Sequence, residues 1–311
     1  MSVQGHVLQA VNTHSPANRI RKLFPAETLV AALFIAPSLF GLFVFFIRPT
    51  VQGFYLSLTD SDLLTHASFI GWANYQRLLQ DKQFVSSLLI TLNYVLLNIP
   101  LQTVLALILA SLMARFTQSM ALRGLVLLPW LIPILMATLI WISILSSIGP
   151  ADGILKLLGL PQVCFMCQAY IIPSIAWINI WRHTGYNALL FFAGLQTIPK
   201  ELYEAAAIDG AGEWRTFRSI TLPLLRPVTV FILVTSFVGS FQVYDSVAVS
   251  AVPVGGPGGA TRVIYWYILD LAFNRFNMGY AATVAVALFL ISLALAAAQL
   301  WYFRANTSDL G

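Results

Sequence analysis

Residues Glu204–Pro227, EAAAIDGAGEWRTFRSITLPLLRP, form a polar and charged insert between two long apolar stretches. Only 9% of the whole chain is charged, yet this insert holds Glu204, Asp209, Glu213, Arg215, Arg218 and Arg226. Its beginning favours a short helix over Glu201–Ala207, because Glu, Leu and Ala have high helix propensity. Gly210 is suited to end that helix, since glycine accepts the left-handed conformation that a helix C-terminus often needs.

The borders of the insert carry further helix and turn signals. Pro199 stands where the first turn of a helix tolerates proline, and Thr197 is the candidate N-cap. A second short helix is expected over Gly212–Thr221, and Pro223 and Pro227 mark the return to the next apolar stretch. An ordinary cytoplasmic loop could carry the same charges, so the order of the motifs has to decide what the insert is.

That order resembles the EAA loop of ABC importer permeases, the inner-membrane components of binding-protein-dependent transport systems. The insert has an EAA triplet, a glycine six residues after its glutamate, and the sequence I-x-L-P ten residues further on. The resemblance implies that the loop, at about 196–223, forms a coupling helix that docks in a cleft of a cytoplasmic ATPase. The residues then expected at this contact are Glu204, Ala205, Ala206, Asp209, Gly210, Ala211, Leu222 and Pro223.

The composition indicates a polytopic membrane protein. Of the 311 residues, 59% are hydrophobic and 9% are charged, whereas roughly 25% charged residues is usual in a soluble domain. The net charge of +5 does not predict a nucleic-acid partner, because the basic residues form no cluster and are better explained as topology signals. No small-residue cleavage site follows the first apolar run, so we expect no cleaved signal peptide.

Six stretches have the length of about 20 mainly apolar residues that a membrane helix needs. They are Thr28–Ile47, Val85–Ala114, Leu122–Ile148, Ile171–Leu195, Leu224–Ser250 and Gly279–Phe303. We therefore expect an all-α fold, with residues 1–25 as a disordered cytoplasmic tail and residues 26–311 as one six-span domain. With the N-terminus inside, ten Lys and Arg residues lie inside and six outside, which also makes the C-terminus and the EAA loop cytoplasmic.

Other landmarks similar to those of the carbohydrate, maltose-permease-like branch follow in order along nearly the whole chain. They are Gly71–Tyr75, Phe84, Thr91–Tyr94, Arg123 with Leu128 and Pro129, Gly255–Pro257 with Thr261, and Gly279–Ala281. The resemblance implies the type I importer permease fold in a bacterial inner membrane, in contact with membrane lipid. It also implies three partners, namely a second permease, an ATPase dimer and an extracytoplasmic solute-binding protein, and it implies a sugar or sugar derivative as solute.

The chain contains no G-x-x-x-x-G-K-[ST] phosphate-binding sequence, so it cannot hydrolyse ATP by that chemistry. We therefore expect a transport subunit and not an enzyme, with no cofactor or metal of its own. ATP and Mg²⁺ would be used by the partner ATPase.

Polar side chains within the spans are candidates for the solute pathway, because polar groups in lipid are costly. The candidates are Asn179, Arg182, His183, Tyr186 and Asn187 in the fourth span, and Gln242 and Asp245 in the fifth. Asn179, His183 and Asn187 recur every four residues and share one helical face. Gln242 and Asp245 also share a face if the fifth span is straight, and Asp245 would then lie about 30 Å from its inner end.

Several alternatives stay open at this point. Each polar residue could instead join two helices through a hydrogen bond worth about 0.6–2 kcal/mol, and Arg182 could pair with Asp245. His183 has no second ligand at metal-binding spacing. The same fold could carry glycerol-3-phosphate or a phosphodiester. Such a solute would favour several cations in the spans, whereas the spans clearly offer one, Arg182. A six-span channel or an intramembrane enzyme is the alternative from another class.

The second outward loop contains the chain's two cysteines, Cys164 and Cys167. An extracytoplasmic location permits a disulfide, so a short-range bridge is one hypothesis and two incidental thiols are the other. A zinc site is not expected, since the sequence offers no further cysteine and no nearby histidine to complete four ligands.

Overall fold

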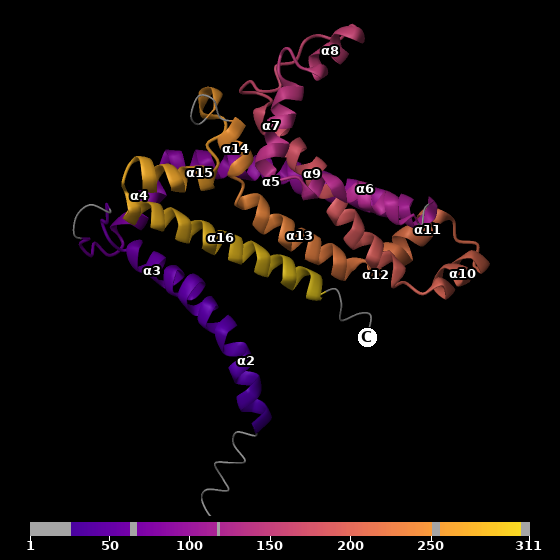
Figure 1. The fold of residues 1–311 in the computed structure, drawn as a ribbon, viewed down its shortest axis with the longest axis horizontal. Helices are drawn as coiled ribbons and strands as arrows, with labels where there is room; N and C mark the ends of the chain where they lie inside the picture. Colours follow the sequence, from indigo (N-terminus) through magenta and orange to yellow (C-terminus); the bar gives the residue numbers. More distant parts are fainter. Residues whose placement is uncertain (1–25, 63–66, 117–118, 251–255, 306–311) are drawn as a thin grey trace, which may run out of the picture. The chain divides into compact units, whose positions relative to one another are not determined.

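A computed structural model describes residues 26–62, 67–116, 119–250 and 256–305 of the chain (Figure 1). The predicted tail of residues 1–25 and the landmark residue Gly255 lie outside the described residues. The α-helices are α2 (Ala26–Leu42), α3 (Arg48–Leu56), α4 (Ala73–Gln80), α5 (Lys82–Phe116), α6 (Met120–Leu131), α7 (Ile134–Leu145), α8 (Pro150–Leu157), α9 (Ile171–Gln196), α10 (Lys200–Ile208), α11 (Glu213–Thr216), α12 (Leu222–Leu224), α13 (Arg226–Phe241), α14 (Asp245–Ser250), α15 (Ile264–Leu269) and α16 (Met278–Ala305). The remaining helical segments are the π-helices η1 (Phe43–Ile47), η2 (Phe217–Thr221) and η4 (Asp270–Asn274) and the 3₁₀ turn η3 (Pro257–Gly259).

The chain divides into two compact units, one ending at Tyr55 and the other beginning at Leu56. In the first unit, α2, η1 and α3 follow one another without a break and belong to a long apolar stretch, Val30–Leu56. The side chains of residues 30–40 are exposed. The predicted first span, Thr28–Ile47, is therefore helical but ends too early in the prediction.

The second unit is built around α5, α9, α13 and α16. Helix α5 packs along α9, and α13 packs against both α5 and α16; Figure 1 shows α13 beside α16. One apolar cluster contains Tyr94, Phe241 and Tyr280 and joins α5, α13, α15 and α16. A second cluster contains Phe191 and Leu225 and lies between α5, α9 and the start of α13. These clusters fix the framework on which the polar residues are carried.

Four helical stretches among the described residues are long and apolar enough to cross a membrane. They are Val30–Leu56, Lys82–Phe116, Ile134–Leu157 and Met278–Tyr302. A fifth arises if Glu213–Leu224 and Arg226–Phe241, which meet at 66°, count as one bent span. The predicted fourth span corresponds to α9, whose 26 residues give a length of about 39 Å. The polar residues in the middle of α9 lower its hydropathy and set it apart from the others.

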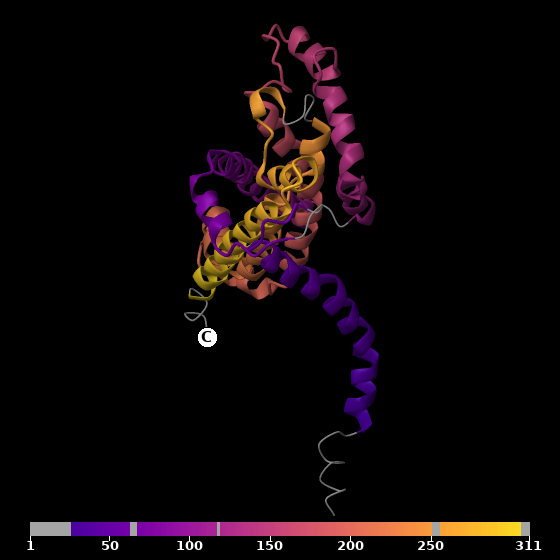
Figure 2. The same ribbon diagram turned by 90° about the vertical axis from the view of Figure 1, so that its left-hand side faces the viewer.

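The predicted third span, Leu122–Ile148, is not one continuous helix. It divides into α6 and α7, which follow one another in the magenta part of Figure 2. Ile132 between them is extended, with φ −72° and ψ 128°. The following residue, Pro133, explains the break, because a proline disfavours helical geometry in the residue before it.

The predicted fifth span, Leu224–Ser250, is also wrong as a single helix. The chain bends at Leu225, α13 ends at Phe241, and a new helix, α14, begins at Asp245. The assumption of a straight helix, with Asp245 about 30 Å from its inner end, therefore fails.

Candidate functional site

The EAA loop consists of α10, a tight turn, α11 and η2. Gly210 has φ +70°, and the N–H groups of Gly210 and Ala211 donate to the carbonyls of Ala207 and Ala206 at 3.1 and 2.9 Å. This pair of hydrogen bonds is the Schellman arrangement, in which a left-handed residue satisfies the last carbonyls of a helix. The predicted helix end at Gly210 is confirmed. The predicted N-cap is wrong, because α10 begins at Lys200 after Pro199, and Thr197 instead ends α9.

The residues predicted for the ATPase contact divide into two groups. Those with exposed side chains or backbone are Glu204, Ala205, Asp209, Gly210 and Leu222, whereas Ala206 is buried and Ala211 and Pro223 are half-buried. Tyr203 and Thr221 share a hydrogen bond of 3.1 Å between their hydroxyls, which ties α10 to η2. Arg115 at the end of α5 pairs with Glu213 at 3.0 Å. These two contacts hold the loop in place, while the residues exposed on it remain accessible to a partner.

Arg182 contacts the backbone at the break between α6 and α7. Its Nε donates to the carbonyl of Ile132 at 3.0 Å. That carbonyl stands at the end of α6, where helix carbonyls lack an intrahelical partner. Asp245 is in none of the ion pairs found among the described residues, so the alternative of an Arg182–Asp245 pair is wrong. Arg182 stabilises a helix end instead.

The other polar residues of α9 have mixed environments. His183 Nδ1 lies 3.1 Å from the carbonyl oxygen of Asn179, and the histidine is half-buried. Asn187 is buried, and its Nδ2 has no hydrogen-bond partner among the described residues. Tyr186 stacks on Trp130, with ring centroids 4.8 Å apart. His183 Nε2 also lies 3.3 Å from Arg182 Nη1. Asn187 Nδ2 is therefore the buried donor of α9 that the described residues leave without an acceptor.

The polar residues of α5 join helices. Asn98 Nδ2 donates to Ser240 Oγ at 3.0 Å, and Gln102 Nε2 donates to Ser236 Oγ at 3.2 Å. Both pairs connect α5 with α13, which is the helix-joining role that such side chains often have in membranes. Sequence reasoning did not single out the two serines, which are separated from their partners by more than 130 residues.

Gln242 and Asp245 do not share a helical face. Gln242 follows the last residue of α13, Asp245 begins α14, and both side chains are exposed. Gln242 lines a cavity of about 510 Å³ between α13, α15 and α16, with Tyr265 and Ser292 as further polar groups. No residue of α9 lines this cavity. The structure thus does not bring the two predicted sets of pathway residues together.

A hydrogen-bonded cluster lies around Asp81, at the opposite end of the 35-residue α5 from the EAA loop. We call Arg77, Asp81, Tyr267 and Tyr280 the Asp81 cluster. Tyr267 donates to Asp81 Oδ2 at 2.6 Å and Tyr280 donates to the same oxygen. The guanidinium of Arg77 lies 4.0 Å from the centroid of the Tyr280 ring. The cluster joins α4, α5, α15 and α16, and sequence reasoning missed it.

The protonation of the Asp81 cluster follows from these contacts. Burial by itself would raise the pKa of Asp81, but hydrogen bonds from the two tyrosines and from the backbone of Gln83 and Phe84 hold it below its ordinary value. Burial and the Asp81 carboxylate raise the pKa of Tyr267. Asp81 is therefore the charged acceptor and the tyrosines are neutral donors.

Several sequence landmarks meet beside the Asp81 cluster. Asn74 is buried and donates to the carbonyls of Ser57 and Thr59 at 3.1 and 2.8 Å. A Cβ at Gly279 would lie 2.1 Å from the Thr59 carbonyl oxygen, so glycine is required there. Further along α5, Thr91 Oγ1 accepts the N–H of Ile264 at 2.8 Å. These landmarks thus serve the packing of one end of the unit.

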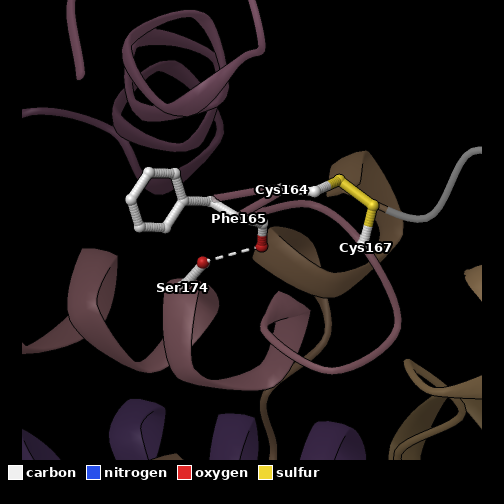
Figure 3. Close-up of a disulfide and its surroundings, with 4 residues drawn as sticks. All are labelled: Cys164, Phe165, Cys167 and Ser174. Carbon is white, nitrogen blue, oxygen red and sulfur yellow. Dashed lines mark hydrogen bonds between the residues drawn. A yellow bond between two sulfur atoms is a disulfide. The ribbon is translucent and has the colours of Figure 1, made fainter. Parts of the chain in front are cut away.

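Cys164 and Cys167 form a disulfide, as one hypothesis predicted (Figure 3). The bridge closes a turn directly before α9, and the Cys167 carbonyl accepts the N–H groups of Tyr170 and Ile171, both at 3.0 Å. Ser174 Oγ donates to the Phe165 carbonyl at 2.9 Å. The turn is therefore fastened to the first turn of α9.

Comparison with known proteins decides the family. A family model described as "Binding-protein-dependent transport system inner membrane component" matches residues 102–305. The chain belongs to this family. It is therefore the permease component of an ABC transport system in a membrane, and the channel and intramembrane-enzyme alternatives are discarded.

Individual relatives agree with this assignment. The trehalose/maltose transport system permease protein MalF of Thermococcus litoralis is 35% identical over 285 residues, which cover 89% of this chain and 94% of the relative. The sn-glycerol-3-phosphate transport system permease protein UgpA of Agrobacterium fabrum is 32% identical over 281 residues, covering 89% and 95%. A chain in the crystal structure of a bacterial alginate ABC transporter, in complex with alginate pentasaccharide-bound periplasmic protein, has a TM-score of 0.76 at 22% identity and is covered to 96%, against 90% of this chain. This last likeness shows the fold.

Proposed function

We propose that this permease carries a sugar or sugar derivative and that a separate ATPase dimer drives transport by binding to its EAA loop. The loop geometry is the main support. Glu204 and Ala205 are exposed on α10, and Asp209 is exposed directly after it. Tyr203 ties α10 to η2, and the Arg115–Glu213 pair ties the following helix, α11, to α5. Such a fixed helix, with small residues beside the exposed carboxylate of Glu204, suits insertion into a cleft of a partner.

The remaining parts of the machine follow from the same proposal. A second related permease would complete the pathway, and a solute-binding protein would deliver the solute at the side opposite the EAA loop. The two termini and the loop would lie in the cytoplasm, as the Lys and Arg bias predicts. ATP and Mg²⁺ would act on the ATPase, and closure of that dimer would turn the permeases between inward and outward states.

For the solute, we propose contacts with Asn179, His183, Tyr186 and Asn187 on α9. Asn187 Nδ2, buried without a partner among the described residues, supports this assignment, because a buried donor costs about 1–3 kcal/mol unless something accepts its hydrogen bond. Sugar hydroxyls both donate and accept, and the Tyr186 ring offers an apolar face. Gln242 and Asp245 are exposed at the opposite end of α13 from the EAA loop and are proposed as contacts at the entrance.

A glycerol-3-phosphate or phosphodiester solute is the second candidate, because one relative of comparable identity has that name. A phosphate group would need cations facing the solute. Arg182 is the cation that the sequence offers within the spans. Its Nε donates to the Ile132 carbonyl and its Nη1 lies 3.3 Å from His183 Nε2, so it is a single, partly occupied cation, which favours the sugar.

The coupling part is tested with Glu204→Lys in the full transporter. Reversal of this exposed charge should reduce ATPase association and solute uptake by about tenfold, as expected for a charge reversal at an interface. The matched control is Glu201→Lys, which reverses a carboxylate on the same helix that lies outside the predicted contact. Equal losses in both variants, or none in either, would contradict the contact.

The solute part is tested separately by uptake into vesicles that contain the assembled transporter and its binding protein. We expect transport of a mono- or oligosaccharide that is blocked by the free sugar and not by glycerol-3-phosphate. The opposite pattern of competition would establish the phosphate solute.

A further inference from the structure

The turn closed by the disulfide, Cys164–Cys167, has no part in the proposed function, and we call it the bridged turn. Its two cysteines are three positions apart, and both are exposed. The stabilisation that a disulfide gives by restricting the unfolded chain grows with the length of the loop that it closes. So short a bridge adds little to global stability, and the contacts that it holds locally are its main consequence.

The bridged turn orders the beginning of α9. The Cys167 carbonyl accepts the N–H groups of Tyr170 and Ile171, both at 3.0 Å, and the Phe165 carbonyl accepts the Ser174 hydroxyl at 2.9 Å (Figure 3). The first N–H groups of a helix have no partner within that helix. The N-cap residue, Tyr170, makes no side-chain capping bond in the described structure, so the turn supplies the acceptors.

The bridged turn also reaches η3 and α7. Gln168 follows the bridge directly, and a Cβ at Gly258 of η3 would lie 2.7 Å from the Gln168 side-chain amide. Gly258 has φ +62°, so the close approach and the backbone both favour glycine there. On the other side, Phe165 lines a cavity of about 300 Å³ together with Leu145 of α7. Three segments of the unit therefore meet at one short, exposed bridge.

Exposure gives a reductant access to this bridge. Thiol–disulfide exchange needs a thiolate that can reach one of the two sulfurs, and exposed disulfides are the labile and regulatory ones. A dithiol completes the reaction in two steps. Its first thiolate attacks one cysteine sulfur and displaces the other, and its second thiolate then releases the sulfur held in the mixed disulfide. Two electrons pass to the bridge, each cysteine sulfur takes up one proton, and the dithiol leaves as a disulfide.

We propose that Cys164 and Cys167 are a reversible redox modification site, reduced and re-formed by exchange with a dithiol–disulfide couple. Reduction frees the turn, so its carbonyl contacts with α9 and the contact of Gln168 with η3 loosen together. Transport then slows, because α9 carries the polar residues proposed for the solute. This last step, and the extracytoplasmic location of the turn, rest on the proposed function. The exchange reaction and the local loosening do not.

The test compares the oxidised and reduced forms of the full transporter, with dithiothreitol as the dithiol. Maleimide labelling and mass spectrometry count the thiols of this chain, which has no cysteine besides these two. Hydrogen exchange, measured without ATP or solute, follows Tyr170 and Ile171 in α9 and Gly259 and Ala260 at the end of η3. We expect about fivefold faster exchange at all four N–H groups after reduction, as for the loss of one ordinary hydrogen bond. The starting rates should return when oxidised glutathione replaces dithiothreitol.

The N–H groups of Gly210 and Ala211 are the internal control. They are hydrogen-bonded within the EAA loop, so their exchange should be the same in both redox forms. Gln168→Ala is the matched control variant, because it keeps the bridge and removes the side chain that lies against η3. It should speed exchange at Gly259 and Ala260 and leave α9 as in the oxidised parent.

The double variant Cys164→Ser with Cys167→Ser imitates the reduced form. It should exchange as the reduced parent does and should not respond to dithiothreitol. Uptake into vesicles should fall in the reduced parent and recover after reoxidation, while the serine variant stays at the lower level throughout. If the serine variant does not fold, the parent protein in its two redox forms still carries the test.

Four results would overturn the proposal. Absence of labelling in excess dithiothreitol would show a bridge closed to exchange. Equal exchange at Tyr170 and Ile171 in the two forms would show that the bridge does not order α9. Faster exchange at Gly210 and Ala211 as well would show general unfolding. Equal uptake in the two forms would remove the regulatory role. Labelling and hydrogen exchange need no solute, so failure of the sugar assignment would leave both results readable.

Discussion

The EAA loop and the Asp81 cluster lie at opposite ends of α5 and are ordered in different ways. In the loop, the shape depends on a left-handed glycine and a few ties from behind, while the side chains of Glu204 and Asp209 remain exposed. In the cluster, the Asp81 carboxylate accepts hydrogen bonds from two tyrosines and from the backbone. The difference agrees with the proposed function, in which the loop meets a partner, whereas the contacts of the cluster lie within the chain.

The largest expected effect concerns Asp81. Asp81→Ala leaves two tyrosine hydroxyls without their acceptor, so we expect a loss of about 2–4 kcal/mol in the free energy of unfolding. Asp209→Ala, which removes an exposed carboxylate from the loop, should change stability by less than about 0.5 kcal/mol. Thermal unfolding and yield of the purified protein measure both. Equal stability of the two variants would remove the distinction between the regions.

A second, smaller effect concerns the backbone of the loop. Gly210→Val forces a β-branched residue into φ +70° and should cost about 1–2 kcal/mol locally. No atom lies within 4 Å of the added Cβ, so the expected cause is backbone strain and not the clash that a crowded glycine would produce. We predict that the protein inserts normally while ATP-driven uptake is lost.

Gly212→Val is the matched control for this change. Gly212 also has open space around its Cβ position, but its φ is −68°, which any residue adopts. The Gly212→Val variant should keep most of the solute uptake of the parent transporter. Loss of uptake in both glycine variants would show that bulk, and not the left-handed turn, is what the loop cannot accept.

The same contrast decides how much could be read from the sequence. The turn at Gly210 was predictable because local chemistry, helix formers followed by glycine, determines it. The Asp81 cluster was not, because Asp81 meets Tyr267 and Tyr280 across 186 and 199 residues, and no periodicity encodes such a contact. The family fold was predictable from six apolar stretches and ordered landmarks.

The breaks within the spans were missed for a different reason. Pro133 ends α6 whereas Pro129 lies inside the same helix, and the sequence alone does not say which proline will break a helix. In this chain Arg182 donates a hydrogen bond to the freed Ile132 carbonyl, and that tertiary contact stabilises the break at Pro133. The end of α13 at Phe241 likewise has no proline or glycine signal immediately after it, so the positions of Gln242 and Asp245 were wrongly predicted.

A third prediction uses pH to sharpen the comparison. The folded-state pKa of Asp81 is lowered, below the unfolded value of about 3.9. The folded state therefore holds fewer protons, so the stabilisation is present above about pH 4 and is lost as the pH falls through the folded pKa. Asp81→Asn should remove this part of the acid sensitivity. Unfolding midpoints measured from pH 6 to pH 3 provide the test, and parallel curves for the parent and Asp81→Asn would contradict it.

The smallest expected effect on stability concerns Asp245. Like Glu204 and Asp209 of the loop it is exposed, and it forms no ion pair with Arg182 among the described residues. Asp245 begins α14, and a carboxylate in the first turn of a helix contributes about 0.3–1 kcal/mol. Asp245→Ala should therefore lower stability by no more than that, while uptake falls if the residue contacts the solute at the entrance. Asp245→Asn should be milder, since the amide keeps an acceptor oxygen.

The double change with Arg182 separates this role from a structural one. Arg182→Gln frees the Ile132 carbonyl and should destabilise on its own. Because Arg182 and Asp245 form no ion pair in the described structure, their effects on the unfolding free energy should add within about 0.5 kcal/mol. Partial rescue in the double variant would instead reveal an ion pair formed in the assembled transporter. Normal uptake with normal yield in Asp245→Ala would place Asp245 outside the pathway.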